Sequence, residues 1–340
     1  MSNQVLTILA GGYSRRFQKN DGKWLDKALL YIEEKPLLIH LIEQGEEKYD
    51  CINISVNSSS RMGDYEKIVK NYSPDVKVNF TIDLKKITLD GVLKGIYSSL
   101  ANYKGSIIQF VPSDRPYLDL SILRGMRVRK RGVSFLQYEN GMIEPLLALY
   151  GCETVFPDNF AQLPLSRADV PIRLSNEIQA YSIKEILDWN NLSSNIFTNV
   201  NIQTDIDDRE LEKPASTSIN IPTPATIERE NIDYSIDKSQ YKEGSRFIEN
   251  LIGVENYYSA FLFSFYFWKQ KEISTGEYKE LGIKSLKKEH EFWISNEMPF
   301  LALHSLDDLA KYFPDERKSN VIRELEKLRR KMKIKPRRIE

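Results

Sequence analysis

The feature that most constrains the fold is a repeated alternation in the first part of the chain. From residue 4 to about residue 200, short β-branched or apolar runs alternate with longer amphipathic segments, and glycine or proline stands at many of the joints. Helices that cross between successive parallel strands produce this pattern. We therefore expect an α/β fold, Rossmann-like and three-layered, with a mostly parallel sheet.

The pattern also gives the expected positions of the elements. The predicted strands span residues 5–10, 52–57, 76–82, 106–111, 132–137 and 146–149. The predicted helices span residues 36–45, 60–72, 89–103, 119–129 and 182–189. Strands and helices in this order place a helix after most strands.

A change of composition indicates a second part of the protein. Residues 212–226 read EKPASTSINIPTPAT, which is rich in proline, serine and threonine, as extended linkers are. Beyond it, apolar residues return every three or four positions, as in a small helix bundle. We predict an α/β domain at 1–211, a linker at 212–227, and a smaller all-α domain at 228–340 with a basic C-terminal tail.

The charge balance and the apolar segments exclude several classes of protein. Lys and Arg total 48, and Asp and Glu also total 48, so no overall charge attracts nucleic acid or a membrane surface. No segment has the length of a bilayer span, and the N-terminus lacks the features of a signal peptide. The two cysteines, Cys51 and Cys152, match no metal or redox spacing. We expect a cytoplasmic protein that binds neither nucleic acid nor membrane.

A glycine pair follows the first predicted strand directly. Gly11 and Gly12 let the backbone approach a ligand closely and offer N–H donors to a phosphate or a base. Cationic Arg16 and Lys27 are then positioned to neutralise a triphosphate. Asp21 and Lys23 form an alternative acidic–basic pair to Asp26 and Lys27. Neither the dinucleotide fingerprint nor the P-loop spacing is present.

A carboxylate follows the predicted strand at 106–111. Asp114 lies just beyond the strand's C-terminal end, which is where α/β proteins place their ligands. A hard oxygen ligand at this position suits Mg²⁺, whose other coordination sites go to water and to the nucleotide phosphates. A turn carboxylate without a metal is the alternative interpretation of the same residue.

Four motifs follow one another along the chain. They are LAGGYSRR at 9–16 with KALL at 27–30, VPSDRPYL at 111–118, GMIEPL at 141–146, and NVNIQTD at 199–205. This ordered series resembles the motifs of the molybdenum cofactor guanylyltransferase family, a family of MobA-like nucleotidyltransferases, over residues 1–210. Two looser matches agree with it, SVN at 55–57 and GVLKGI at 91–96 after Asp83.

The resemblance implies an activity. The terminal phosphate of molybdopterin, carrying molybdenum or tungsten, would attack the α-phosphorus of GTP, release pyrophosphate and form the guanine dinucleotide cofactor. GTP and the molybdopterin cofactor would be the substrates, and Mg²⁺ the metal. Molybdoenzymes or other cofactor-biosynthesis proteins would be partners through the helical domain, whose sequence itself carries no recognisable motif.

The resemblance also assigns roles to residues. The catalytic residues would be Arg16, Lys27 and Asp114, and Asp114 would hold the metal. The nucleotide-binding set would be Leu9, Ala10, Gly11, Gly12, Lys27, Asn57, Asp83, Gly91 and Asp114. The pterin side would be lined by Glu144, Asn199 and Asn201.

Two departures from the family pattern keep alternatives open. Gln18 stands where the family usually has glycine, and the insertion KNDGKWL separates the loop from Lys27. The alternatives are another nucleotidyltransferase of the same fold, using CTP or a sugar phosphate, and a non-catalytic protein that binds a nucleotide and assists cofactor insertion.

Overall fold

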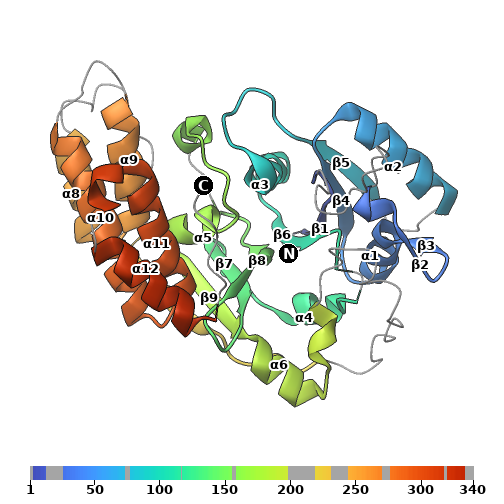
Figure 1. Cartoon of the computed structure of the whole chain (residues 1–340). Helices are drawn as coiled ribbons and strands as arrows, with labels where there is room; N and C mark the ends of the chain where they lie inside the picture. Colours follow the sequence, from blue (N-terminus) through green and yellow to red (C-terminus); the bar gives the residue numbers. More distant parts are fainter. Residues whose placement is uncertain are drawn as a thin grey trace, which may run out of the picture.

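The computed structural model describes residues 3–12, 26–72, 77–115, 117–154, 158–197, 219–230, 244–269, 276–317 and 320–333. These residues contain an eight-stranded sheet in the order β10-β9-β7-β8-β6-β1-β4-β5. Figure 1 shows the sheet extending from β5, beside α2, to β9, beside a group of C-terminal helices.

One half of the sheet is parallel throughout. Its strands are β6 (Ile107–Pro112), β1 (Gln4–Leu9), β4 (Cys51–Val56) and β5 (Val78–Ile82). β4 is buried at every position and lies between β1 and β5, as a strand with six consecutive buried residues must. A small separate hairpin, β2 (Tyr31–Ile32) and β3 (Lys35–Pro36), precedes the first α-helix.

The other half of the sheet is mixed. Its strands are β8 (Ile143–Tyr150), β7 (Gly132–Gln137), β9 (Glu177–Ser182) and β10 (Ala225–Glu228). β8 is antiparallel to both β6 and β7, β9 is parallel to β7, and β10 is antiparallel to β9.

Helices cover both faces of the sheet, which makes three layers. On one face lie α1 (Leu37–Glu46), α2 (Ser59–Tyr72), α4 (Leu120–Gly125) and α6 (Ile183–Asn190). Their apolar residues form one core with the inward side chains of β1, β4 and β8. On the other face lie α3 (Gly91–Asn102) and α5 (Val170–Leu174), which pack on β6, β7 and β9.

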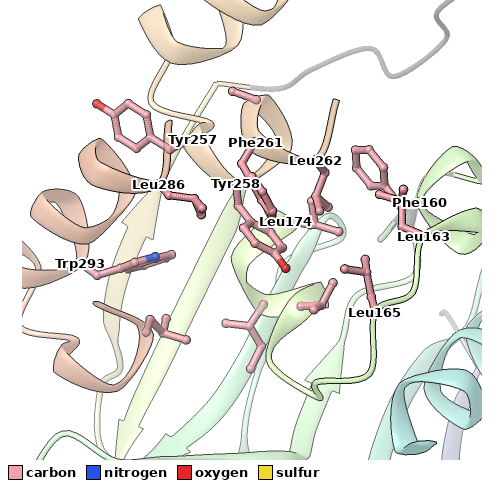
Figure 2. Close-up of a cluster of buried hydrophobic side chains, with 14 of the residues drawn as sticks. Phe160, Leu163, Leu165, Leu174, Tyr257, Tyr258, Phe261, Leu262, Leu286 and Trp293 are labelled. Atoms are coloured by element: carbon pink, nitrogen blue, oxygen red, sulfur yellow. The ribbon is translucent and has the colours of Figure 1, made fainter. Parts of the chain in front are cut away.

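The C-terminal helices join this second core. They are α8 (Gly244–Gly253), α9 (Tyr257–Lys269), α10 (Gly276–Ser295), α11 (Pro299–Tyr312) and α12 (Asn320–Lys331). Figure 2 shows Tyr258 and Leu262 of α9 packed toward Leu163, Leu165 and Leu174 of the α/β part. The helical region therefore shares a continuous apolar core with the sheet.

A buried group of charges lies in the same contact. The guanidinium of Arg173 on α5 is fully buried and donates from Nε to Glu289 of α10 at 2.8 Å and from a terminal nitrogen to Asp308 of α11 at 2.7 Å. It also lies over the ring of Tyr258, 3.6 Å from the centroid. We call Arg173, Glu289 and Asp308 the interhelical charge cluster.

These observations confirm the expected fold class: a mostly parallel sheet in three layers, followed by a helical region. Four strands were not predicted: β9 and β10 of the large sheet, and β2 and β3 of the separate hairpin. The expected helix at 119–129 is wrong beyond residue 125, because Met126 has an extended backbone. The domain division stays a prediction, and residues 225–227 of the expected linker lie in β10. Among the described residues, no helix combines the length and the apolar character that a bilayer span requires.

Candidate active site

Four strand ends meet at one edge of the sheet. The register pairs Leu9 with both Ser55 and Pro112, so β1, β4 and β6 end side by side. Backbone hydrogen bonds continue past the strands, from Asp83 N to Val56 O at 3.0 Å and from Ser113 N to Leu9 O at 3.2 Å. The glycine pair, Asn57, Asp83 and Asp114 therefore follow strands that end at the same edge, as predicted for a ligand site in an α/β fold.

The two glycines differ in their surroundings. A Cβ at Gly11 would lie 3.2 Å from the backbone nitrogen of Asn57, so the absence of a side chain lets β1 and β4 stay close at their ends. A Cβ at Gly12 would meet nothing within 4 Å. Gly11 is thus required by the fold, whereas Gly12 leaves backbone accessible from the outside.

The loop after β1 is held by a helix behind it. Arg61 of α2 donates to the carbonyl oxygens of Ala10 at 3.3 Å and of Gly12 at 3.0 Å. Tyr65, one turn further along α2, donates to Asp26 Oδ2 at 2.7 Å, and the Nε of Arg61 lies 3.4 Å from the same oxygen. This arrangement fixes the glycine loop and the 26–29 segment against each other.

Asp26 stabilises the turn that carries Lys27. Its Oδ1 accepts from Ala28 N at 3.1 Å and caps a short 3-10 helix, Lys27–Leu29. Burial raises the pKa of Asp26, while Tyr65 and Arg61 oppose that rise. Because both oxygens already have protein partners, Asp26 is poorly placed to bind a metal.

Lys27 and Asp114 face each other. The Nζ of Lys27 lies 3.5 Å from Asp114 Oδ2, and both side chains are mostly buried, with 13% and 26% of their surface exposed. A single mostly buried carboxylate beside a cation fits the way proteins bind Mg²⁺ together with nucleotide phosphates, which need few protein ligands. The described residues contain no group of three or more His, Cys, Asp or Glu side chains around one metal position, so the nucleotide would have to complete the coordination.

Asp83 lies where α3 approaches the same edge. A Cβ at Gly95 would be 2.9 Å from Ser55 Oγ and 3.5 Å from Asp83 Oδ1, so this helix passes close to β4 and β5. Burial raises the pKa of Asp83 to about 6, although Lys94 acts in the opposite direction. Gly91 has a φ of +58° and opens α3, whose first amide donates to Asp90 Oδ1 at 2.7 Å.

A second polar group lies next to the first. Arg115 directly follows Asp114, is only 3% exposed, and donates to Glu144 Oε2 on β8 at 2.6 Å. Tyr138 donates to the other oxygen of Glu144 at 2.8 Å, and Arg115 also donates to the carbonyl oxygen of Phe197. We call Arg115, Glu144 and Tyr138, with the Phe197 carbonyl, the Arg115 clamp.

Burial and charge act in opposite directions on the clamp. Burial disfavours the Arg115 cation, but Glu144 and Tyr138 outweigh it and raise the pKa of the guanidinium. Burial, together with the Glu144 carboxylate, raises the pKa of Tyr138 to about 12. At neutral pH the clamp is therefore a cation bound to a carboxylate, with a protonated phenol as the second donor.

The structure describes most of the predicted site residues, and the others lie outside the described part of the chain. Those that the structure brings to the edge are Leu9, Ala10, Gly11, Gly12, Lys27, Asn57, Asp83, Asp114 and, in the clamp, Glu144. Gly91 lies at the start of α3, near the carbonyl oxygen of Ser166. Arg16, Asn199, Asn201 and the alternative pair Asp21 and Lys23 lie outside the described residues.

Sequence reasoning missed four residues around the site. Arg61 and Tyr65 carry a signal only in hindsight, since an Arg and a Tyr four positions apart on a helix share a face. Arg115 lay within a recognised motif but received no role, and Tyr138 directly follows the strand predicted at 132–137. Their reach to the edge depends on tertiary packing, which a single sequence does not display.

Comparison with known proteins identifies the region that carries this edge. Residues 6–167 match the family described as MobA-like NTP transferase domain. A probable molybdenum cofactor guanylyltransferase of Pyrococcus horikoshii is 28% identical over 150 residues, which is 44% of this chain and 70% of that protein. The molybdenum cofactor guanylyltransferase of Aliivibrio salmonicida is 29% identical over 118 residues, or 34% of this chain and 51% of that protein.

A solved structure gives a further comparison. The crystal structure of molybdopterin-guanine dinucleotide biosynthesis protein A from Archaeoglobus fulgidus is 20% identical, with a TM-score of 0.44, over 60% of this chain and 95% of that one. The matched family region ends at residue 167, so β9, β10 and the C-terminal helices lie beyond it.

Proposed function

We propose that this protein transfers GMP from GTP to the molybdopterin cofactor, because residues 6–167 match the family described as MobA-like NTP transferase domain. The observation that carries the proposal is the Lys27–Asp114 pair, 3.5 Å apart, at the sheet edge that also holds the glycine pair. A cation, a carboxylate and accessible backbone are what a metal-bound triphosphate requires.

In this proposal the residues of the edge bind and orient the nucleotide. Backbone at Gly11 and Gly12 contacts the nucleotide, and Lys27, with Arg16, neutralises phosphate charge. Asp114 would hold Mg²⁺, which when bound stabilises the negative charge that develops on the phosphates. Asn57, Asp83 and Gly91 would lie along the guanine and ribose.

The reaction needs positioning more than a protein nucleophile. An oxygen of the acceptor's terminal phosphate forms a bond to the α-phosphorus of GTP, and the bond from that phosphorus to the oxygen bridging to the β-phosphate breaks, so pyrophosphate leaves. Such transfers depend on in-line alignment and charge neutralisation. Glu144, Asn199 and Asn201 are assigned to the acceptor side, opposite the leaving pyrophosphate.

The direct test incubates the purified full chain with GTP, Mg²⁺ and molybdopterin. We expect pyrophosphate and the guanine dinucleotide cofactor in equal amounts, and competition by CTP should be weak. If no pyrophosphate forms, while CTP or a sugar phosphate gives product under the same conditions, guanylyl transfer to molybdopterin is the wrong activity.

The proposal predicts a large effect at Asp114. Asp114→Ala should lower kcat/KM by about 100-fold or more, because a metal ligand contributes several kcal/mol of transition-state stabilisation. The melting temperature should hardly change, since the side chain lies at a sheet edge and not in a core. Asp64→Ala, which removes a carboxylate that is 63% exposed on α2, is the matched control and should keep wild-type turnover.

A further inference from the structure

Arg115 occupies an unusual position for a charged side chain. It is 3% exposed, although it directly follows Asp114 at the end of β6, where the other site residues are partly open to solvent. Burying a guanidinium is unfavourable unless partners satisfy it. The partners of Arg115 therefore show which parts of the protein its burial holds together.

The partners come from two elements that are distant in sequence. One is Glu144, 29 positions away on β8, and the other is the carbonyl oxygen of Phe197, 82 positions away at the end of a 3-10 helix, Ser194–Phe197. Phe197 stands two residues before Asn199. Arg115 thus connects the turn of Asp114 with Glu144, which the proposed function assigns to the acceptor side, and with the end of a 3-10 helix that precedes Asn199 in the sequence.

Both carboxylate oxygens of Glu144 already accept hydrogen bonds from protein side chains. Oε2 accepts from Arg115 at 2.6 Å, and Oε1 accepts from Tyr138 at 2.8 Å. A carboxylate engaged at both oxygens holds other groups in place. This indicates a supporting role for Glu144, although sequence reasoning places it on the pterin side.

The far end of the clamp is itself fixed. Tyr138 begins the turn between β7 and β8, and the helical region contacts this turn at both sides. Gln137 Nε2 donates to the carbonyl oxygen of Glu297 at 3.4 Å, and Asn140 Nδ2 donates to that of Met332 at 3.1 Å. A cation held by such an anchored carboxylate has little freedom to move.

We propose that Arg115 is a positioning residue that sets the acceptor side of the active site relative to Asp114, acting through Glu144 and through the Phe197 carbonyl at the end of the 3-10 helix. This inference rests on the proposed function, since it concerns the acceptor of that same reaction. A guanidinium suits the task because its planar fork binds two partners in fixed directions, which a lysine cannot do.

The test compares Arg115→Lys, Glu144→Gln and Tyr138→Phe in the full chain. For Arg115→Lys we expect the KM for molybdopterin to rise about tenfold, while the KM for GTP changes less than about twofold. Tyr138→Phe keeps the ion pair and should have a smaller effect in the same direction. Arg124→Lys, an exposed arginine that donates to a backbone carbonyl, is the matched control.

Hydrogen exchange supplies a second measurement, independent of the acceptor. Arg115→Lys should speed amide exchange in residues 138–144 and 190–197 and leave β1 and β4 unchanged. A merely structural role would raise both KM values together and lower the melting temperature, and that result would overturn the inference. Equal KM values and equal exchange in wild type and variant would overturn it as well.

The two proposals can fail separately. If the wild-type chain makes no product from molybdopterin, guanylyl transfer fails, and the inference is then decided by hydrogen exchange and by direct binding of GTP with Mg²⁺. If the wild type is active and Arg115→Lys matches it in acceptor KM, the assignment of Arg115 fails while the function stands.

Discussion

Arg115 and Arg173 are the two most deeply buried arginines among the residues that the structure describes, and they lie in different regions. Arg115 lies at the sheet edge beside Asp114, and Arg173 lies under the C-terminal helices, where it contacts Glu289 and Asp308. Both guanidinium groups bind a carboxylate closely. They differ in what they join. Arg115 joins the turn of Asp114 to β8 and to the end of a 3-10 helix, and Arg173 joins a helix of the α/β part to two helices of the C-terminal region.

The comparison teaches that buried charge alone does not indicate function. The interhelical charge cluster lies between α5 and the C-terminal helices, where Arg167 and Asp169 add further ion pairs and α9 contributes apolar side chains. The Arg115 clamp ends at segments that carry family motifs. We therefore interpret the first as a specific contact between two parts of the fold and the second as part of the active site.

Removing Arg173 should have a large effect on stability. Arg173→Met should lower the free energy of unfolding by about 3–5 kcal/mol, because Glu289 and Asp308 would be left buried with less compensation. Urea unfolding of the full chain measures the loss. At a temperature where the variant is folded, the KM for GTP should equal that of the wild type.

A surface arginine provides the control for that experiment. Arg131 pairs with Glu153, and their side chains are 52% and 44% exposed. Arg131→Met should change the free energy of unfolding by less than about 1 kcal/mol. If both arginine variants lose the same small amount, the helical region does not depend on the interhelical charge cluster.

A smaller effect is expected where the two regions touch, at the β7–β8 turn. Gly141 has a φ of +79°, and a Cβ there would lie 2.3 Å from Cγ of Pro299 on α11. Gly141→Ala should cost about 2 kcal/mol of stability, because an alanine is strained at this φ and would displace the proline. Thermal unfolding measures the loss.

The same variant also tests the Arg115 clamp, because the turn carries Tyr138. If the helical region steadies the clamp, Gly141→Ala should raise the KM for the acceptor as well as lower the melting temperature. Gly253→Ala is the control, since a Cβ there would meet nothing within 4 Å. A melting temperature unchanged by Gly141→Ala would contradict the close packing on Pro299.

The parallel half of the sheet could be predicted from the sequence because its strands are continuous apolar runs. β1, β4 and β6 are buried on both faces, which leaves a clear signal. β9 has only Ile178, Ala180 and Tyr181 among polar residues, and β10 lies in a segment of linker-like composition. Both segments become strands because they pair with strands that are distant in sequence: β9 pairs with β7, and β10 pairs with β9.

The same distinction holds for the site and for the helical region. Gly11, Gly12 and Asp114 could be predicted because strand ends of a parallel sheet share one edge, whereas Arg61 reaches that edge from a helix behind it. The run Tyr257–Lys269 is apolar on nearly all sides, which predicted a buried helix. The helical period does not show which surface this helix covers. In the structure it packs toward Leu163, Leu165 and Leu174 of the α/β part.

The smallest expected effect concerns Asp83, on the nucleotide side of the same edge, and it separates that side from the clamp. Burial raises the pKa of Asp83 to about 6, so the folded chain binds more protons than the unfolded chain between about pH 4 and pH 6. Stability from this group is therefore present at low pH and falls as pH rises through that window. Asp83→Asn should remove the fall, which makes the variant more stable relative to wild type at pH 7 than at pH 4.5. The gain should be about 1 kcal/mol, because the carboxyl is half-buried and solvent screens it.

Melting temperatures between pH 4.5 and 7.5 measure the difference, with Asp64→Asn as the control for loss of one charge. A difference that does not vary with pH would mean that Asp83 is not the buried carboxyl that the geometry indicates.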